Sequence, residues 1–261
     1  MIKFLEPLSS AEGDTLAAFC EGSVFGLKAF GPVLSYGLGY DFVSAWEQRS
    51  EEGKRTAFLS KYYGTATVHC TPDADREELL SFLKMVGFSA LFGPAELLKN
   101  SYTHGTEGCV MALEKGRACT AKGSTETDLE LCWDNDYADF YEVLSGSNPG
   151  YLTGGYTDFL TDFSHRVRHG TAHVLLLKSR GRPVATTAAL VKTEGELFLG
   201  GVATLPEERG KHYASSCLSA FCDRYPEHRV FLCCRPEKRV FYEHLGFAKV
   251  NDFLELESSQ K

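Results

Sequence analysis

The sequence lacks three features that would each define a class of protein. It has nine cysteines but no C-x-x-C pair, so it offers no spacing typical of a structural zinc site. No apolar run approaches the roughly 20 residues of a membrane span, and the opening MIKFLEPLSS has no secretory signal. We therefore expect reduced thiols, no metal, no membrane partner and a cytoplasmic location.

An excess of basic residues is also missing. The 27 Lys and Arg residues are outnumbered by 35 Asp and Glu residues, which gives a formal net charge of −8. Such a chain has no general field that attracts nucleic acid, so we expect no duplex nucleic acid partner. A local phosphate site remains compatible with this charge, because the backbone N–H groups at the start of a helix can bind an anion.

The chain does contain ample apolar material for packed cores. Hydrophobic residues make up 43% and aromatic residues 12% of its 261 residues, and a chain of this length predicts two domains of ordinary size. The small, polar segment EKGRACTAKGSTET at 114–127 marks the boundary. We expect an N-terminal α/β module at 1–120 and a second domain at 127–261.

Hydrophobic periodicity predicts an α/β fold, of the α+β type with a mixed sheet, in which strands and helices alternate. In the N-terminal module the pattern predicts helices at 11–21 and 75–86 and strands at 56–62 and 65–70. In the second domain it predicts strands at 128–132, 173–178, 183–191, 196–205 and 229–233, and helices at 135–144, 156–169, 209–224 and 237–244.

One internal similarity suggests a duplication. The segment from Phe82 to Phe88 ends in Gly-Phe after a predicted helix, and the segment from Phe241 to Phe247 does the same. In both segments the glycine suits the left-handed residue that often ends a helix. We interpret this as a possible duplicated half, while an ordinary helix end followed by a core aromatic would produce the same pattern.

The segment that carries the chemistry joins the predicted strand at 196–205 to the predicted helix at 209–224. Pro206 blocks continuation of the strand, and Arg209-Gly210-Lys211 follows. The first turn of a helix has unpaired backbone N–H groups and the positive end of the helix dipole, which together can hold a diphosphate. Gly210 allows close approach, and Arg209 and Lys211 add positive charge.

This segment resembles the acyl-CoA diphosphate loop of the GNAT N-acetyltransferase superfamily, usually written Q/R-x-x-G-x-G/A. Arg209 matches the first position and Ala214 the last, while His212 stands where the family usually has glycine. The resemblance implies the GNAT fold in the second domain, and possibly a degenerate GNAT-like copy in the first. It implies acetyl-CoA as co-substrate, bound by the following residues: Val202, Ala203, Thr204, Arg209, Gly210, Lys211, His212, Tyr213 and Ala214.

A second segment resembles the family downstream, where Tyr242 precedes Gly246-Phe247. The resemblance implies that the hydroxyl of Tyr242 lies near the coenzyme sulfur and assists the departing thiolate. The asparagine that the family often has upstream is Arg235 here. The counterpart of Tyr242 in the first half would be Leu83, which cannot donate a hydrogen bond.

An amine acceptor must lose a proton before it attacks, so the reaction needs a base or a water relay. Family members often place a base on the strand that leads to the loop, which makes Glu196 our candidate. Asp158 and Asp162 are alternatives, because a spacing of four places them on one helix face, where they could also bind a cationic substrate.

The resemblance thus implies an acetyl-CoA-dependent N-acetyltransferase that transfers an acyl group to a primary amine by direct attack. Its partners would be acetyl-CoA and an amine acceptor, which the sequence does not identify; the oligomeric state is also open. Two alternatives stand beside this hypothesis: a non-catalytic acyl-CoA-binding sensor, and a tandem-GNAT transferase with another donor, such as aminoacyl-tRNA.

Overall fold

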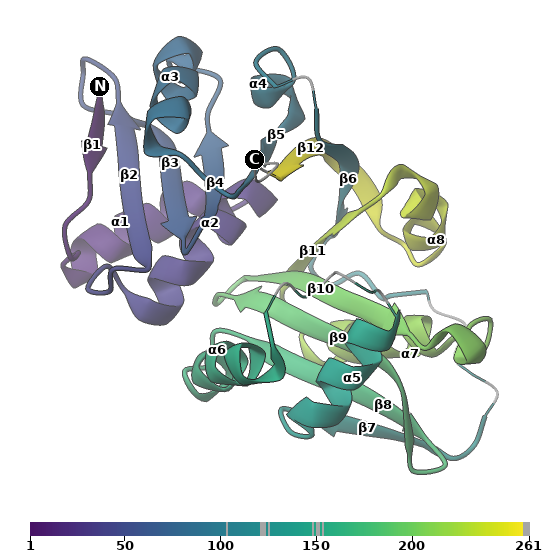
Figure 1. Cartoon of the computed structure of the whole chain (residues 1–261). Coiled ribbons are helices and arrows are strands. Elements are labelled where there is room, and N and C mark those ends of the chain that lie inside the picture. The colour runs from purple at the N-terminus through teal and green to yellow at the C-terminus, as the bar shows by residue number, and fades with distance from the viewer. Residues whose placement is uncertain are drawn as a thin grey trace. The chain divides into compact units, whose positions relative to one another are not determined.

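The computed structural model describes residues 1–102, 104–120, 124, 126–147, 149, 152 and 154–257. The chain packs as two compact units (Figure 1). Unit 1 contains Met1–Val110, Cys234–Pro236 and the chain from Val250 on, and unit 2 contains Met111–Cys233 and Glu237–Lys249. A module at 1–120 and a domain at 127–261 stay predictions about independent folding.

Both units contain the same succession of elements: a strand, two helices, three strands, a helix, a strand and a helix. In unit 1 these are β1 (Ile2–Phe4), α1 (Ser10–Cys20), α2 (Val24–Tyr36), β2 (Val43–Arg49), β3 (Arg55–Tyr62), β4 (Thr65–Cys70), α3 (Arg76–Val86), β5 (Ala90–Pro94) and α4 (Ala95–Leu98). In unit 2 they are β7 (Leu129–Trp133), α5 (Tyr137–Ser147), α6 (Tyr156–Arg168), β8 (His173–Ser179), β9 (Arg182–Lys192), β10 (Glu196–Thr204), α7 (Tyr213–Arg224), β11 (Arg229–Cys234) and α8 (Arg239–His244).

Strand pairing repeats in the same way, which confirms the expected mixed α/β fold. In unit 1, β1 to β4 form an antiparallel succession and β5 pairs parallel with β4. In unit 2, β7 to β10 form an antiparallel succession and β11 pairs parallel with β10. The parallel pairs are each joined by a crossover helix, α3 or α7, as parallel neighbours require.

Two further strands, β6 (Thr106–Leu113) and β12 (Ala248–Glu257), complete the sheet order. The end of β12 pairs antiparallel with β5, from Phe253 opposite Pro94 to Glu257 opposite Ala90. The last strand of the chain is therefore part of the sheet of unit 1. This is why the packing units are not continuous in sequence.

Helices cover both faces of the sheet in unit 1. Side chains of β3 alternate, because Phe58 packs in the core under α1 and α2 while Ala57 and Leu59 pack in the core under α3. In unit 2, Phe140 of α5 and Phe159 of α6 share one core with Val174, Ala188 and Ala203 of the sheet. Figure 1 shows α5 and α6 on one face of this sheet and α7 on the other.

The helix α2 was not predicted from the sequence, and its composition explains why. Its 13 residues VFGLKAFGPVLSY include two glycines and Pro32, and nine of them are buried. A helix that is apolar on most sides shows no amphipathic period. The sequence pattern therefore had no signal with which to distinguish it from a strand or a loop.

Two expectations are corrected by the structure. The helix expected at 209–224 begins at Tyr213, because Gly210 (φ 84°) and His212 (φ 64°) both leave the right-handed helical region. The segments around Leu83 and Tyr242 are also not equivalent. Within the repeated order α3 corresponds to α7, while α8 corresponds to α4.

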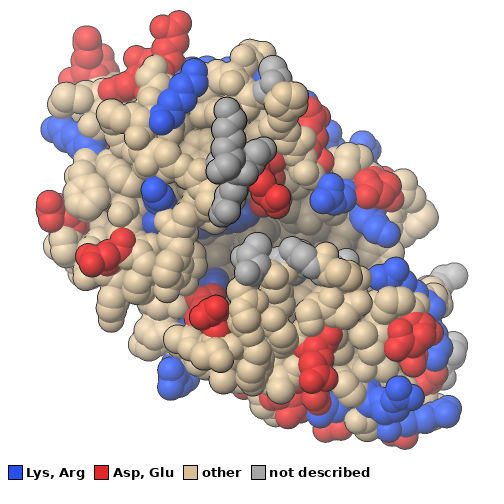
Figure 2. All heavy atoms as spheres, viewed as in Figure 1, with Lys and Arg blue, Asp and Glu red and all other residues tan. Residues whose placement is uncertain are grey.

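None of the described helices is long and apolar enough to cross a membrane. On the face seen in Figure 2, Lys and Arg side chains are interspersed with Asp and Glu, and neither sign covers that face. The prediction of a cytoplasmic location is not tested by either observation.

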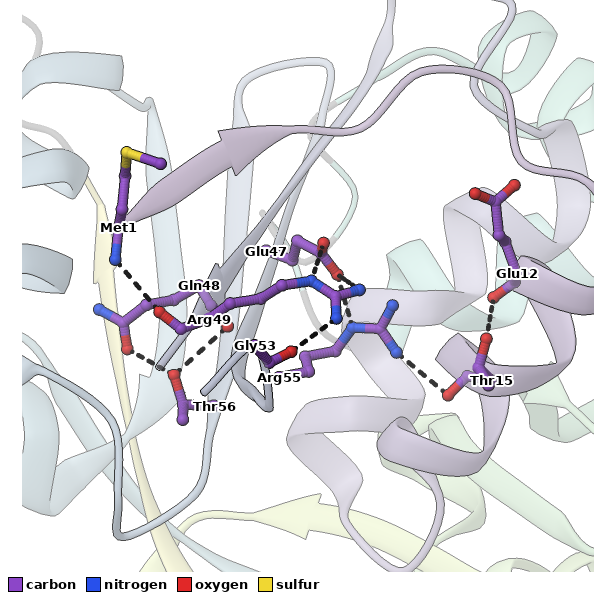
Figure 3. A network of polar contacts seen from close by, with 9 residues as sticks. All are labelled: Met1, Glu12, Thr15, Glu47, Gln48, Arg49, Gly53, Arg55 and Thr56. Carbon is purple, nitrogen blue, oxygen red and sulfur yellow. Dashed lines mark hydrogen bonds and ion pairs between the residues drawn. The ribbon is translucent and has the colours of Figure 1, made fainter. Parts of the chain in front are cut away.

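A network of charged side chains ties β2, β3 and α1 of unit 1 together (Figure 3). Arg55 donates to Glu47 at 2.7 Å and to the backbone oxygen of Thr15 at 3.1 Å, and Arg49 donates to the same carboxylate. Glu47 is only 6% exposed. Burial raises the pKa of Glu47, but the hydrogen bonds from Arg49 and Arg55 outweigh it, so that the pKa is lowered overall.

We expect the variant Glu47→Gln to lose on the order of 2 kcal/mol of unfolding free energy at pH 7. Because the folded pKa lies below the unfolded one, this contribution is present above the unfolded pKa of about 4.3 and is lost as the pH falls through the folded pKa. Urea unfolding between pH 3 and 8 measures it. The exposed Glu96, which pairs with Arg76, is the control: Glu96→Gln should cost less than about 1 kcal/mol. Equal losses at pH 3 and pH 7 in Glu47→Gln would contradict the assignment.

Candidate functional site

Unit 2 contains a cavity of about 130 Å³ where β10 and β11 part. The parallel pairing of the two strands runs from Glu196 opposite Arg229 to Leu199 opposite Leu232 and ends there. The residues that line the cavity are Leu144, Leu199, Gly200, Gly201, Val202, Leu232, Cys233 and Tyr242. Separation of two strands at this point exposes backbone groups of β10 to the cavity.

A β-bulge in β10 lies at the same place. Along the pairing with β9, Gly200 lies opposite Ala188 and Ala203 opposite Thr186, so that Gly201 and Val202 together oppose one residue. Gly201 has φ 58°, which other residue types adopt only at a cost. A Cβ on Gly200 would lie 2.4 Å from the side chain of Leu190. Both glycines are therefore needed for this shape of the strand.

Six residues that line the cavity were not predicted from the sequence as site residues: Gly200, Gly201, Leu144, Leu199, Leu232 and Cys233. A usable signal existed for the glycines, since glycine inside an apolar strand often marks a bulge or a close approach of the backbone. For the leucines and Cys233 no signal existed, because apolar residues in buried strands and helices look alike whether they line a cavity or fill a core.

The structure places Tyr242 at the cavity. Its side chain is 8% exposed and packs edge-on against Phe247. Val202, which was expected to contact the coenzyme, also lines the cavity, whereas Ala203 is buried in the core with Phe140. The site therefore combines one phenol with the open backbone of β10.

The loop after β10 connects the end of this strand, at Thr204, to the start of α7 at Tyr213. It contains a short turn, Pro206–Glu208, and then Arg209 to His212. The first N–H that returns to the helix is that of Ser216, bonded to the backbone oxygen of His212 at 3.0 Å. No side chain in the described part of the chain caps α7. The N–H groups of its first turn therefore point out of the helix end.

The two cationic side chains of this loop are engaged within the protein. Arg209 donates to the backbone oxygens of Thr204 at 3.3 Å and of Ser147 at 3.1 Å. Lys211 binds Glu208 at 2.6 Å, and this hydrogen bond raises the pKa of Lys211. Arg209 thus connects β10 to the end of α5.

Two more residues of the expected coenzyme loop have clear positions. The ring of Tyr213 is 1% exposed, and its hydroxyl lies 3.3 Å from the hydroxyl of Ser179. This side chain is a core residue rather than a surface ligand. His212 occupies the left-handed position in which the family pattern has glycine, which gives that pattern a conformational reason.

The structure does not bring Glu196 to the cavity. Glu196 is 4% exposed and begins β10, about 16 Å along the strand from Gly201. Asp158 accepts from the backbone N–H of Gly155 at the start of α6, and Asp162 pairs with Arg166 at 3.1 Å. Both aspartates therefore have roles within α6.

The corresponding place in unit 1 has no bulge, since β3 and β4 pair there without a register shift. The last parallel pair there is Thr67 opposite Phe92, so the residues that correspond to Gly200 and Gly201 are Val68 and His69. A Cβ on Gly93 would lie 2.5 Å from Val68, which shows how closely the two strands pack. The ring of His69 lies 5.1 Å from that of Phe19, and burial lowers the pKa of this imidazole.

The start of α3 is capped. Asp75 caps the helix by accepting from the N–H of Glu78 at 3.0 Å, and Glu77 and Glu78 occupy the first turn. The Asp75 carboxylate satisfies the N–H of Glu78, and the three negative charges repel an anion. Among its described residues, unit 1 thus has neither the glycine bulge nor the uncapped helix start of unit 2.

Solved structures share this architecture. A tandem GNAT protein from the clavulanic acid biosynthesis pathway matches with a TM-score of 0.60 at 13% identity over 100% of both chains. A GCN5-related N-acetyltransferase from Sphaerobacter thermophilus matches with a TM-score of 0.61 at 14% identity, over 97% of this chain and 94% of that chain. Another from Kribbella flavida has a TM-score of 0.55 at 12% identity, over 79% and 88%. At these identities the likeness establishes the fold.

The family follows from the sequence of unit 2. Residues 134–247 match the model of the acetyltransferase (GNAT) family, and this part of the chain belongs to that family. Membership supports an acyltransferase, and the repeated order of elements supports a GNAT-like copy in the first half. No curated protein has a sequence that matches this chain significantly.

We expect Gly201→Ala to destabilise the protein by about 1 to 2 kcal/mol, because alanine must adopt φ 58° while its Cβ has ordinary contacts of 3.6 Å and more. The matched control is Gly13→Ala in α1, where no atom lies within 4 Å of the added Cβ. This control should gain about 0.5 to 1 kcal/mol. Chemical unfolding measures both. A neutral or stabilising Gly201→Ala would show that the bulge does not have this conformation.

Proposed function

We propose that unit 2 transfers an acetyl group from acetyl-CoA to a primary amine by direct attack. One observation carries the proposal: the glycine bulge beside the cavity and the uncapped helix that follows β10 occur together in unit 2, whereas the described part of unit 1 has a regular ladder and a capped helix at the corresponding places. The first feature suits a thioester and the second suits a diphosphate. A chain that needed this architecture only for stability would have no reason to keep one copy open.

Binding would use the backbone more than side chains. The diphosphate would accept hydrogen bonds from the loop of Arg209 to Ala214, where the helix dipole adds to the attraction. The pantetheine arm would follow β10 at Val202 and Thr204, and the acetyl group would enter the cavity. Arg209 would support this loop through Thr204 and Ser147, to which it is bonded.

In the chemical step the amine attacks the thioester carbonyl carbon and the coenzyme leaves as a thiolate. Tyr242 is the phenol at the cavity. A free phenol has a pKa of about 10 and a free thiol one of about 8.5. Full proton transfer to the thiolate is therefore uphill by roughly 2 kcal/mol in water. A hydrogen bond from the phenol to the developing thiolate avoids that cost and stabilises the transition state.

The amine must also lose a proton, at a cost of roughly 4 kcal/mol at neutral pH for a pKa of about 10. The described residues that line the cavity include no carboxylate or imidazole. We therefore propose that water receives this proton. Glu196 could act as the base only through a relay of water molecules along β10, because of its distance from Gly201.

The proposed diphosphate site at the start of α7 can be tested by placing an aspartate at its N-cap, as Asp75 stands at the N-cap of α3. We expect His212→Asp to bind acetyl-CoA about 30-fold more weakly than His212→Asn. The reason is that repulsion between a carboxylate and an adjacent diphosphate costs about 2 kcal/mol or more near a protein surface. Both residues tolerate the left-handed conformation, so the pair differs only in charge. Calorimetry measures the dissociation constants. Equal affinities would show that the diphosphate does not bind at this helix.

Tyr242→Phe separates an enzyme from a sensor. We expect it to slow transfer about 10- to 100-fold with unchanged acetyl-CoA affinity, because the hydroxyl assists only the leaving group. Released CoA thiol, measured with small amines, amino acids, peptides and lysine-containing proteins as acceptors, reports the rate. Tyr225→Phe, outside the cavity, is the control and should be unaffected. Absence of turnover in every variant, with acetyl-CoA bound, would favour the sensor.

A further inference from the structure

The carbonyl of Gly201, in the middle of the bulge, has a specific partner. The hydroxyl of Thr186 on β9 donates to this oxygen at 2.8 Å. Thr186 is 0% exposed, so the bond lies wholly inside unit 2. In the sheet order β9 and β11 lie on opposite sides of β10. The Gly201 carbonyl therefore points to the side of β10 that is away from the parted strands.

Peptide planarity then decides where the next N–H points. In a trans peptide the C=O and the following N–H point in opposite directions, and the described chain has no cis peptide bond. Because the Gly201 carbonyl points to Thr186, the N–H of Val202 points toward β11. Val202 lines the cavity on that side. A donor thus faces the space in which a thioester carbonyl would lie.

This peptide has another orientation open to it. Gly201 adopts positive φ, where glycine has wide freedom, and the pairing of β10 with β11 ends at Leu199. The strand ladder therefore does not fix the Gly201–Val202 peptide on the cavity side. If the hydroxyl of Thr186 were absent, the buried carbonyl would lose a partner, which is unfavourable. Rotation of the peptide toward the cavity would relieve this.

Unit 1 shows the contrast. Its β3 and β4 pair without interruption, with Ala57 opposite Cys70, Phe58 opposite His69 and Leu59 opposite Val68. There is no bulge at His69, the residue that corresponds to Gly201. In a ladder without a bulge the backbone hydrogen bonds fix each peptide, so no side chain is needed to orient one. Unit 1 has such a ladder at this place.

We propose that Thr186 is a positioning residue that holds the Gly201–Val202 peptide with its N–H toward the thioester oxygen. This inference rests on the proposed function of unit 2. When the amine attacks the carbonyl carbon, the π electrons move to the oxygen, and the Val202 N–H stabilises the resulting negative charge. The oxyanion then re-forms the carbonyl and the C–S bond breaks, so that the coenzyme leaves as a thiolate. The nitrogen releases its proton to water, and the thiolate can take up a proton from water in turn.

Three variants test the proposal. Thr186→Val keeps the shape of the side chain and removes the hydroxyl, and Thr186→Ser keeps the hydroxyl. The matched control is Thr187→Val on the same strand. Thr187 is equally buried, and its hydroxyl donates to the backbone oxygen of Thr186 rather than to the bulge. Thermal unfolding of each variant verifies that it is folded.

The readout is the infrared carbonyl stretch of acetyl-CoA carrying ¹³C at the thioester carbonyl, recorded bound and free. In the native protein, Thr186→Ser and Thr187→Val, we expect binding to lower this frequency, because a hydrogen bond weakens the C=O bond. In Thr186→Val we expect the frequency of free acetyl-CoA, unchanged affinity, and a transfer rate lower by about 10-fold or more. Complete loss of such a donor typically costs 10²- to 10³-fold.

Each outcome decides one question. The same lowered frequency in Thr186→Val as in the native protein would overturn the role of Thr186. If Thr186→Val does not fold, the native protein alone still decides, because a bound thioester with the frequency of the free one would rule out the Val202 donor. If acetyl-CoA does not bind to the native protein at all, the proposed function fails, and this result is distinct from both others.

Discussion

The site depends on the parting of two parallel strands. Up to Leu199 and Leu232 the strands β10 and β11 are held by a regular ladder, and beyond it Gly200 and Gly201 turn the backbone of β10 into a bulge. Side chains of ordinary size could not follow, since a Cβ on Gly200 would collide with Leu190 and one on Gly201 would require positive φ. The cavity, the placement of Tyr242 beside it and the orientation of the bulge peptide all follow from this departure from regular pairing.

The same succession of elements occurs twice, and the comparison of the two copies shows how little separates an open site from a packed core. At the corresponding place unit 1 has Val68 and His69, and its ladder with β3 is regular there. A helix follows in both copies, but α3 begins with Asp75 as its cap. The two copies therefore differ in the strand and at the helix start while their order of elements is the same.

The two cationic side chains of the loop before α7 have partners within the protein. Arg209 and Lys211, which a sequence pattern presents as phosphate ligands, are bonded to backbone oxygens and to Glu208. An acidic protein can therefore bind an anionic coenzyme without a basic surface, because the N–H groups of one helix turn supply the donors. Arg209 connects the end of β10 to the last residue of α5.

The sequence by itself determined the family of the second half, because this depends on local patterns of glycine, proline and aromatic residues. The coenzyme roles of the loop from Arg209 to Ala214 and of Tyr242 stay predictions from the same patterns. It also predicted most strands and helices of unit 2, whose periodicity is regular. It could not determine α2, which is apolar on most sides. It also could not determine the start of α7, which lies after Gly210 and His212 because both have positive φ. Only the tertiary structure showed that Glu196 lies far from the cavity, that α3 corresponds to α7, that β12 pairs with β5, and that Thr186 bonds to Gly201. The last two are contacts between residues distant in the chain, and the first two depend on where the strands part and on the order of elements in the fold. All four are decided by packing rather than by local sequence.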